Sequence, residues 1–328
     1  MEQKSDVEYR AEKLYKNSRE KFGYLIREVV SNAIHAVIIR KNLNQQEGYI
    51  PRVEFAVTSG EGSVEIVVKD NGEGFNQSNC HYFTHLDTKN SQKEKLHFHP
   101  QGQGRLSVVF FSDKANYSSI YMDDFGVFQR RTSDYPEKSM PLFDVEELES
   151  SPTDEKETGT VLKLAISKQQ TYGRAKTFFT SYPDIEKLSD WFIENFFPFF
   201  IEYEDLVLAL HLNGYVKNIN RTYIEKKVES IPFSVYFGEI EKEKNDFKIW
   251  LVEKSGKPRS RNPVSCFARH LRAELEGARL EYEIDLPLAY DWLLTSEYFD
   301  DNVDQKGDKI EIDDISVEKI QSALRAYS

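Results

Sequence analysis

Residues 27–36 read REVVSNAIHA, and this stretch indicates the fold more strongly than any other part of the sequence. Apolar residues recur in it at steps of three and four, which predicts a helix within residues 5–40. Glu28 and Asn32 are four residues apart, so on a helix they share one face about one turn apart. A carboxylate that can accept a proton from water and an amide oxygen suited to Mg²⁺ would then lie side by side. A solvated helix face is the alternative interpretation of this pair.

A second stretch, DNGEGF at residues 70–75, follows a strand predicted over residues 63–69. The Asp70 carboxylate could accept a hydrogen bond from an exocyclic amine such as that of adenine. Gly72 and Gly74 would let the backbone pass close to a flat ring, because they have no Cβ. A strand-ending turn without a ligand is the alternative.

Two further motifs place glycine next to a predicted element. QGQGRLS at residues 101–107 leads into a helix predicted over residues 105–115, where exposed N–H groups and the helix dipole favour a phosphate. The motif lacks the Gly-Lys-Ser/Thr of a Walker A loop and is not a complete dinucleotide fingerprint. TGT at residues 158–160 opens a predicted strand, and the Thr160 hydroxyl could bond to Asp70 or to a water.

The order and separation of these four motifs resemble the GHKL ATPase superfamily, which includes gyrase B, the heat-shock chaperone ATPases, sensor histidine kinases and MutL. The resemblance covers roughly residues 20–167. It implies an α/β fold, a two-layer sandwich with a mixed sheet (the Bergerat fold), with ATP between a helix and a lid. The matching residues are Glu28, Asn32, Ala33, Ala36, Asp70, Gly72, Gly74, Gly102, Gln103, Gly104, Gly159 and Thr160.

The resemblance also implies a role for each matching residue. Glu28 would orient and deprotonate the attacking water, Asn32 would coordinate Mg²⁺, and Asp70 would bind the adenine amine. Thr160 would support Asp70. We refer to residues 75–104 as the lid, because residues 75–101 are predicted as a long loop of the kind that covers active sites. The lid residues that would close over the phosphates are Gly102, Gln103 and Gly104, followed by Arg105.

The sequence departs from the superfamily pattern at two histidines. His35 stands where many relatives have Asp, and His99 stands where a first glycine is often found. Neither change removes a residue assigned to adenine or to the metal. Four lid histidines, at 81, 85, 97 and 99, could form a zinc site, but no cysteine pair accompanies them, which favours ordinary lid residues.

The chain has 328 residues, enough for two domains, predicted at 1–182 and 183–328. The second is expected to be a smaller α/β, transducer-like domain, as in the gyrase–chaperone–MutL branch. Only 27 residues precede Glu28, too few for the phosphorylated helical hairpin of a sensor kinase. The predicted later elements are a helix at 184–197 ended by Pro198, a hairpin at 206–216, strands within 233–253, a helix at 266–275, a strand at 309–312 and a final helix after Ser316.

Two basic features of the second domain are open to more than one interpretation. In the branch that the layout resembles, a transducer lysine or arginine often reaches the γ-phosphate, and Lys306 is the candidate for that catalytic role; a solvated turn lysine is the alternative. The basic residues between 254 and 261 could contact phosphate or nucleic acid, although an exposed loop is the simpler interpretation.

Composition limits the possible partners and location. Charged residues make up 30% of the chain and the net charge is −12, so nucleic acid could be bound only at a confined basic patch. Cys80 and Cys266 lie far apart, which fits a reducing compartment. With no signal peptide and no apolar run of about 20 residues, the sequence predicts a cytoplasmic protein.

The combined expectation is Mg²⁺-dependent binding and slow hydrolysis of ATP, which would drive lid closure and homodimerisation. The client could be DNA-processing, defence or chaperone-like, with an effector protein or domain outside this chain. A nucleotide-gated interaction module with little hydrolysis is the alternative, and a protein kinase is a third. Glu28 distinguishes the first two, because only a hydrolase needs its carboxylate for turnover.

Overall fold

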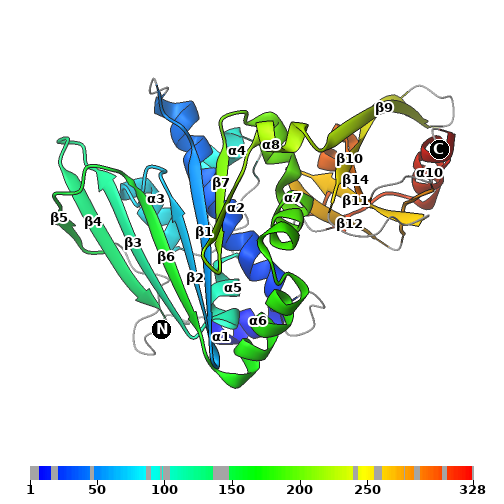
Figure 1. The fold of residues 1–328 in the computed structure, drawn as a ribbon. Coiled ribbons are helices and arrows are strands. Elements are labelled where there is room, and N and C mark those ends of the chain that lie inside the picture. Colours follow the sequence, from blue (N-terminus) through cyan, green and yellow to red (C-terminus); the bar gives the residue numbers. More distant parts are fainter. Residues whose placement is uncertain are drawn as a thin grey trace. The chain divides into compact units, whose positions relative to one another are not determined.

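The computed structural model of the protein confirms the predicted α/β class. It describes residues 7–15, 21–44, 48–85, 90–96, 98, 104–135, 148–238, 243–254, 261–276, 278–283, 289–304 and 309–326. The chain forms two compact units, the first from Met1–Ile185 and Asp205–Asn218, the second from Glu186–Glu204 and Ile219–Ser328. Each unit contains a mixed sheet (Figure 1).

The first unit has an eight-stranded sheet in the order β5-β4-β3-β6-β2-β1-β7-β8. Only the β1–β7 pair is parallel among the strand pairs with a described register in this sheet, with Arg52 opposite Val207. The strands are β1 (Arg52–Gly60), β2 (Ser63–Asp70), β3 (Lys114–Met122), β4 (Phe128–Tyr135), β5 (Ser150–Pro152), β6 (Gly159–Ile166), β7 (Val207–Leu212) and β8 (Tyr215–Ile219).

Helices cover one face of this sheet (Figure 1). Along β2 every second side chain, from Val64 to Asp70, is buried, whereas Ser63, Glu65 and Lys69 are exposed. This alternation is what a sheet covered on one face requires, and it gives a two-layer sandwich. The helices are α1 (Val7–Tyr15), α2 (Lys21–Asn44), α3 (Gln77–Thr84), α4 (Ser91–Lys95), α5 (Arg105–Phe111) and α6 (Gln169–Ser181).

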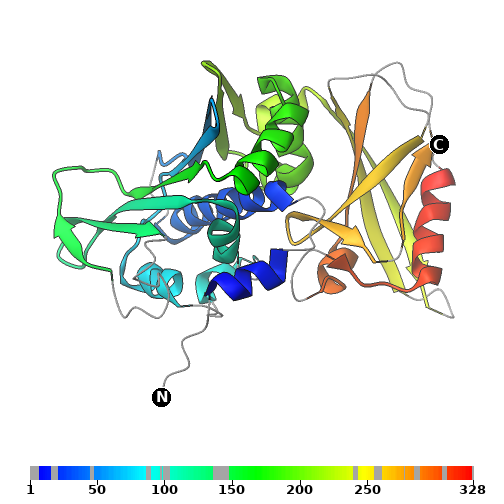
Figure 2. The ribbon, with the colours of Figure 1, turned by 90° about the horizontal axis from the view of Figure 1, so that it is seen from below.

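Helix α2 is the central helix of the first unit. It packs on β1 and β2, and it also contacts α5, which lies beside α1 (Figure 2). Residues Phe22–Asn42 have the length and hydropathy of a membrane-spanning helix, yet 72% of the most apolar window is buried inside the fold, as in the core helix of a soluble protein. The burial explains why this helix carries so few charges for its length.

Residues 75–101, predicted as a long loop, contain two short helices among their described positions. The Asn76 side chain accepts a hydrogen bond from the Asn79 N–H (2.9 Å) and begins α3. Asn90 accepts from the N–H groups of Gln92 (3.0 Å) and Lys93 (3.2 Å) and begins α4. The loop prediction was wrong here because these asparagines are N-caps.

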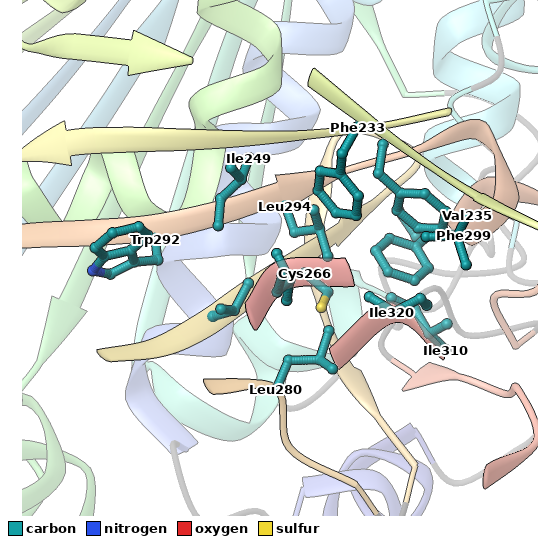
Figure 3. Packing of buried hydrophobic residues seen from close by; sticks show 14 of the residues in the cluster. Phe233, Val235, Ile249, Cys266, Leu280, Trp292, Leu294, Phe299, Ile310 and Ile320 are labelled. Carbon is teal, nitrogen blue, oxygen red and sulfur yellow. The ribbon is translucent and has the colours of Figure 1, made fainter. Parts of the chain in front are cut away.

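The second unit is built around a sheet in the order β15-β12-β11-β14-β10-β9, with β13 paired to β11. Its strands and α10 enclose a core that includes Cys266, Phe299 and Ile320 (Figure 3). The elements are α7 (Ile185–Glu202), α8 (Arg221–Glu225), β9 (Val228–Phe237), β10 (Glu243–Glu253), β11 (Arg261–Ala268), β12 (Leu271–Leu275), β13 (Glu281–Glu283), β14 (Tyr290–Thr295), α9 (Glu297–Asp301), β15 (Lys309–Ile310) and α10 (Asp314–Ala326).

Two predicted elements of this unit differ in the structure. The helix predicted to end at Pro198 continues to Glu202, because Phe199 and Phe200 beyond the proline are fully buried and favour continuation. Residues 266–275 form the hairpin of β11 and β12 and not a helix. Arg269 and His270 have φ of 49° and 69°, so two residues without turn-forming side chains make the left-handed turn.

The predicted division at residue 182 also differs from the observed one. The hairpin β7–β8, with Asn213-Gly214 at its turn as predicted, belongs to the first unit because β7 pairs with β1. The second unit therefore consists of α7 and of the chain after residue 218.

Candidate functional site

The face of α2 that carries Glu28 and Asn32 is contacted at its start by the last residue of the lid. A Cβ built at Gly104 would overlap the Glu28 carboxylate at Oε2. Gly104 has φ −56°, a conformation that any residue can adopt. Glycine is therefore needed there only because a side chain would not fit beside Glu28. The structure thus brings together Glu28 and Gly104, which are predicted site residues 76 positions apart in the sequence.

The same face of α2 is contacted one turn after Asn32 by the turn that follows β2. A Cβ at Gly72 would lie 2.9 Å from the Cβ and 3.0 Å from the carbonyl carbon of Ala36. Arg40 donates to Asn71 O (2.6 Å), and the Thr158 hydroxyl donates to Gly72 O (2.7 Å). The turn is therefore held against the helix, and the missing Cβ of Gly72 leaves room for the contact with Ala36.

Asp70 lies at the end of β2 with its side chain buried. Its Oδ1 accepts hydrogen bonds from the N–H groups of Gly72 (2.9 Å) and Thr160 (3.3 Å). No residue in the described part of the chain donates to Oδ2. Burial raises the Asp70 pKa to about 7, although the two backbone hydrogen bonds and Arg40 act to lower it. The carboxyl group thus has one fixed oxygen and one available acceptor.

Thr160 contacts Asp70 through its backbone N–H, whereas the sequence had suggested a bond from the Thr160 hydroxyl to Asp70 or to a water. The hydroxyl lies 2.9 Å from Ser119 Oγ on β3. Ser119 Oγ also accepts from the Phe75 N–H (2.7 Å) and is fully buried. Ser119, which the sequence did not single out, therefore ties β3 and β6 to the turn after β2.

Gly74 in this turn and Gly159 at the start of β6 have backbone conformations that favour glycine. Their φ values are +70° and +148°. A Cβ at Gly74 would overlap the Ile120 carbonyl, and one at Gly159 would overlap the Asp70 carbonyl. Gly74 lets the turn approach β3, and Gly159 lets β6 approach the end of β2 where Asp70 is held.

Lys93 on α4 is a functional-site candidate that the sequence did not reveal. Its Nζ donates to the Asn32 side-chain oxygen at 2.7 Å. Burial lowers the Lys93 pKa to about 8; the nearby Glu28 carboxylate raises it, and Arg105 lowers it further. The face of α2 thus meets Gly104, Lys93 and Gly72 along successive turns.

Two other contacts join described lid residues to α5 and to α2. The Arg105 guanidinium donates to His85 O (2.5 Å) and lies 5.6 Å from the Phe83 ring centre. His35, the departure on α2, is buried and stacks on Phe98 with ring centres 4.1 Å apart. His35 therefore packs against the lid.

Several predicted residues lie outside the described part of the chain: Gly102, Gln103, His97, His99 and Lys306. Among the described residues, no cluster of three histidine, cysteine or carboxylate side chains could hold a metal ion. Lys254, at the start of the basic stretch, pairs with Asp291 in the second unit.

Comparisons with known proteins show the fold. No family model matches the chain. No curated protein matches it either. The chain is similar to a crystal structure of the N-terminal domain of a DNA repair protein, with 12% sequence identity and a TM-score of 0.54. The match covers 98% of this chain and 97% of that one, so the two share a fold over nearly their whole length.

Proposed function

We propose that this chain is a Mg²⁺-dependent ATPase whose nucleotide site lies on the first unit, as the GHKL resemblance implies. One observation carries the proposal. The Asp70 carboxylate is fixed through Oδ1 by two backbone N–H groups, beside a turn that packs on the helix face of Glu28 and Asn32. The available Oδ2 is suited to accept a hydrogen bond from the adenine amine. The helix face of Glu28 and Asn32 would then meet the phosphates.

The donor set fits a magnesium ion. Asn32 is exposed, and its amide oxygen already accepts from a cationic group, the Lys93 ammonium. Bound there, Mg²⁺ would neutralise phosphate charge. Glu28 would accept the proton of the attacking water, with its carboxylate placed by the contact with Gly104. Arg105 and the lid glycines 102 and 104 would close over the phosphates.

The output we propose is a nucleotide-dependent homodimer that acts on an effector or client. ATP can drive closure only by binding the closed state more tightly than the open state. The likeness in fold to the N-terminal domain of a DNA repair protein favours a DNA-processing client over a chaperone-like or defence role. We also propose that the protein is cytoplasmic.

ATP binding and phosphate release test the proposal in the wild type, Glu28→Gln and Asp70→Asn. Glu28→Gln should bind ATP and lose turnover. Asp70→Asn should lose binding, because its amide N–H₂ would face the adenine amine. GTP should bind the wild type more weakly, since its 6-oxo group would face a carboxylate. Binding without wild-type turnover would favour a nucleotide-gated interaction module, and no binding would overturn the proposal.

A further inference from the structure

Lys93 occupies a specific position in the site. Its ammonium lies 2.7 Å from Asn32 Oδ1, the oxygen that would coordinate Mg²⁺ under the proposed function. The Glu28 carboxylate, one turn earlier on α2, lies close enough to attract the same ammonium. The neighbouring Lys95 belongs to the same short helix but is exposed.

A lysine ammonium and a magnesium ion cannot both occupy this position. Each would lie within about 3 Å of the same oxygen, and like charges that close repel strongly in a partly buried site. A cation at Asn32 would also lie where the nucleotide phosphates meet the protein. One positive group at this oxygen can therefore neutralise phosphate charge, and a second one has to displace the first.

We infer that Lys93 is the resident cation of the site, which substitutes for Mg²⁺ at Asn32 and must leave when the metal enters. The inference rests on the proposed ATP site. It means that ATP without metal binds through Lys93, whereas MgATP binds after Lys93 has moved away. Lys93 thus reduces the dependence of nucleotide affinity on metal.

The test is the ratio of two dissociation constants for ATP, one in EDTA and one at saturating Mg²⁺. Lys93→Gln keeps a polar side chain of similar reach but removes the charge. It should weaken metal-free binding by about 10- to 100-fold, the usual effect of one charge-assisted hydrogen bond. MgATP affinity should stay the same or improve, so the ratio rises by at least about tenfold.

Two variants and one ligand serve as controls. Lys95→Gln removes a charge from the same helix and should keep the wild-type ratio. Lys93→Arg keeps the charge and should also stay near the wild type. Adenosine, which has no phosphates, should bind Lys93→Gln and the wild type equally.

An unchanged ratio in Lys93→Gln would overturn the inference. If the ratio is unchanged because metal-free ATP and MgATP both bind more weakly by the same factor, Lys93 is an ordinary phosphate contact. Failure of the wild type to bind ATP in either condition would instead overturn the proposed function, and this inference with it.

Discussion

Gly104 meets Glu28 so closely that the smallest side chain at residue 104 would overlap the Glu28 carboxylate. The contact joins the end of the lid to the residue proposed to activate water. Glycine is required for different reasons at two positions, because Gly74 is needed for its backbone conformation as well as its small size, and Gly104 only for its small size.

Gly104→Ala should therefore impair turnover without unfolding the protein. The overlap is with the end of a flexible side chain, which can rotate away, so we expect the free energy of unfolding to change by less than about 1 kcal/mol. The displaced Glu28 should lower kcat by about tenfold or more, while ATP affinity is nearly unchanged. Gly173→Ala on α6, where a Cβ meets nothing within 4 Å, is the matched control and should keep full turnover. Normal kcat in Gly104→Ala would contradict the assigned role.

Asp70→Asn should change how stability depends on pH. The Asp70 pKa is raised from 3.8 to about 7 in the folded state, so between these values the folded protein holds a proton that the unfolded chain releases. The stability of the wild type therefore falls as pH rises through this window, by up to about 4 kcal/mol. Asparagine cannot ionise and still accepts from Gly72 and Thr160. Urea unfolding from pH 4 to 8, without nucleotide, should show a flatter profile for Asp70→Asn.

Asp113→Asn provides the opposite control. Burial acts to raise the Asp113 pKa, but hydrogen bonds from Ser167 and Lys168 outweigh it and lower the pKa below 3.8. That carboxylate stabilises the fold above its unfolded pKa and loses this effect as pH falls, so Asp113→Asn should destabilise the protein near pH 7. Parallel pH profiles for wild type and Asp70→Asn would contradict the raised pKa of the buried Asp70 carboxyl group.

Gly72→Ala should destabilise the first unit by about 1–3 kcal/mol, because the new methyl group would press on the backbone and Cβ of Ala36. Chemical denaturation measures the change. Ala36→Gly alone should cost about 1 kcal/mol through helix propensity. The double variant should be more stable than the sum of the two changes predicts, since one of the overlapping groups is gone. Strict additivity would show that the two residues do not touch.

His35→Asp, which introduces the residue common in the superfamily that the motifs resemble, should destabilise this protein. The His35 side chain is buried against Phe98, so a carboxylate there would lose both the ring contact and its hydration. We expect the free energy of unfolding to fall by about 2 kcal/mol or more. Thermal unfolding of His35→Asp and of Phe98→Leu would measure this. We expect Phe98→Leu to lose less stability than His35→Asp, because leucine keeps an apolar contact with His35. A stable His35→Asp would mean that the stacking contributes little.

The motifs predicted which distant residues lie together better than they predicted what surrounds them. Glu28, Asp70, Gly72 and Gly104 were grouped from spacing and resemblance. The fold brings Gly104 to Glu28, and it brings Gly72, which is hydrogen-bonded to Asp70, to Ala36 on the same helix. Lys93 could not be found in this way, since QKEK at residues 92–95 reads as a solvated polar run. Lys93 lies in the first turn of the helix that Asn90 caps, and its ammonium reaches Asn32, 61 residues earlier.

The errors elsewhere have the same physical origin. The turn at Arg269-His270 carries none of the glycine or asparagine signals of a hairpin, so local preference favoured a helix that the sheet overrides. The position of the β7–β8 hairpin depends on its parallel pairing with β1, more than 140 residues away, and no local pattern encodes that distance. The features that could be predicted are set by local sequence. The features that could not be predicted depend on tertiary contacts.

The β7–β8 hairpin also determines where this protein can be cut into fragments and how its units can be exchanged by recombination. Because β7 and β8 return to the first unit after α7, the polypeptide passes between the units three times, at residues 185–186, 204–205 and 218–219. A fragment ending at residue 182 would leave the β1 edge open, and one starting at residue 183 would carry two strands with no sheet to join, both aggregation hazards. Neither unit is a contiguous cassette. A single recombination event between them would disrupt both, so we expect the two to have been exchanged among proteins only as a pair.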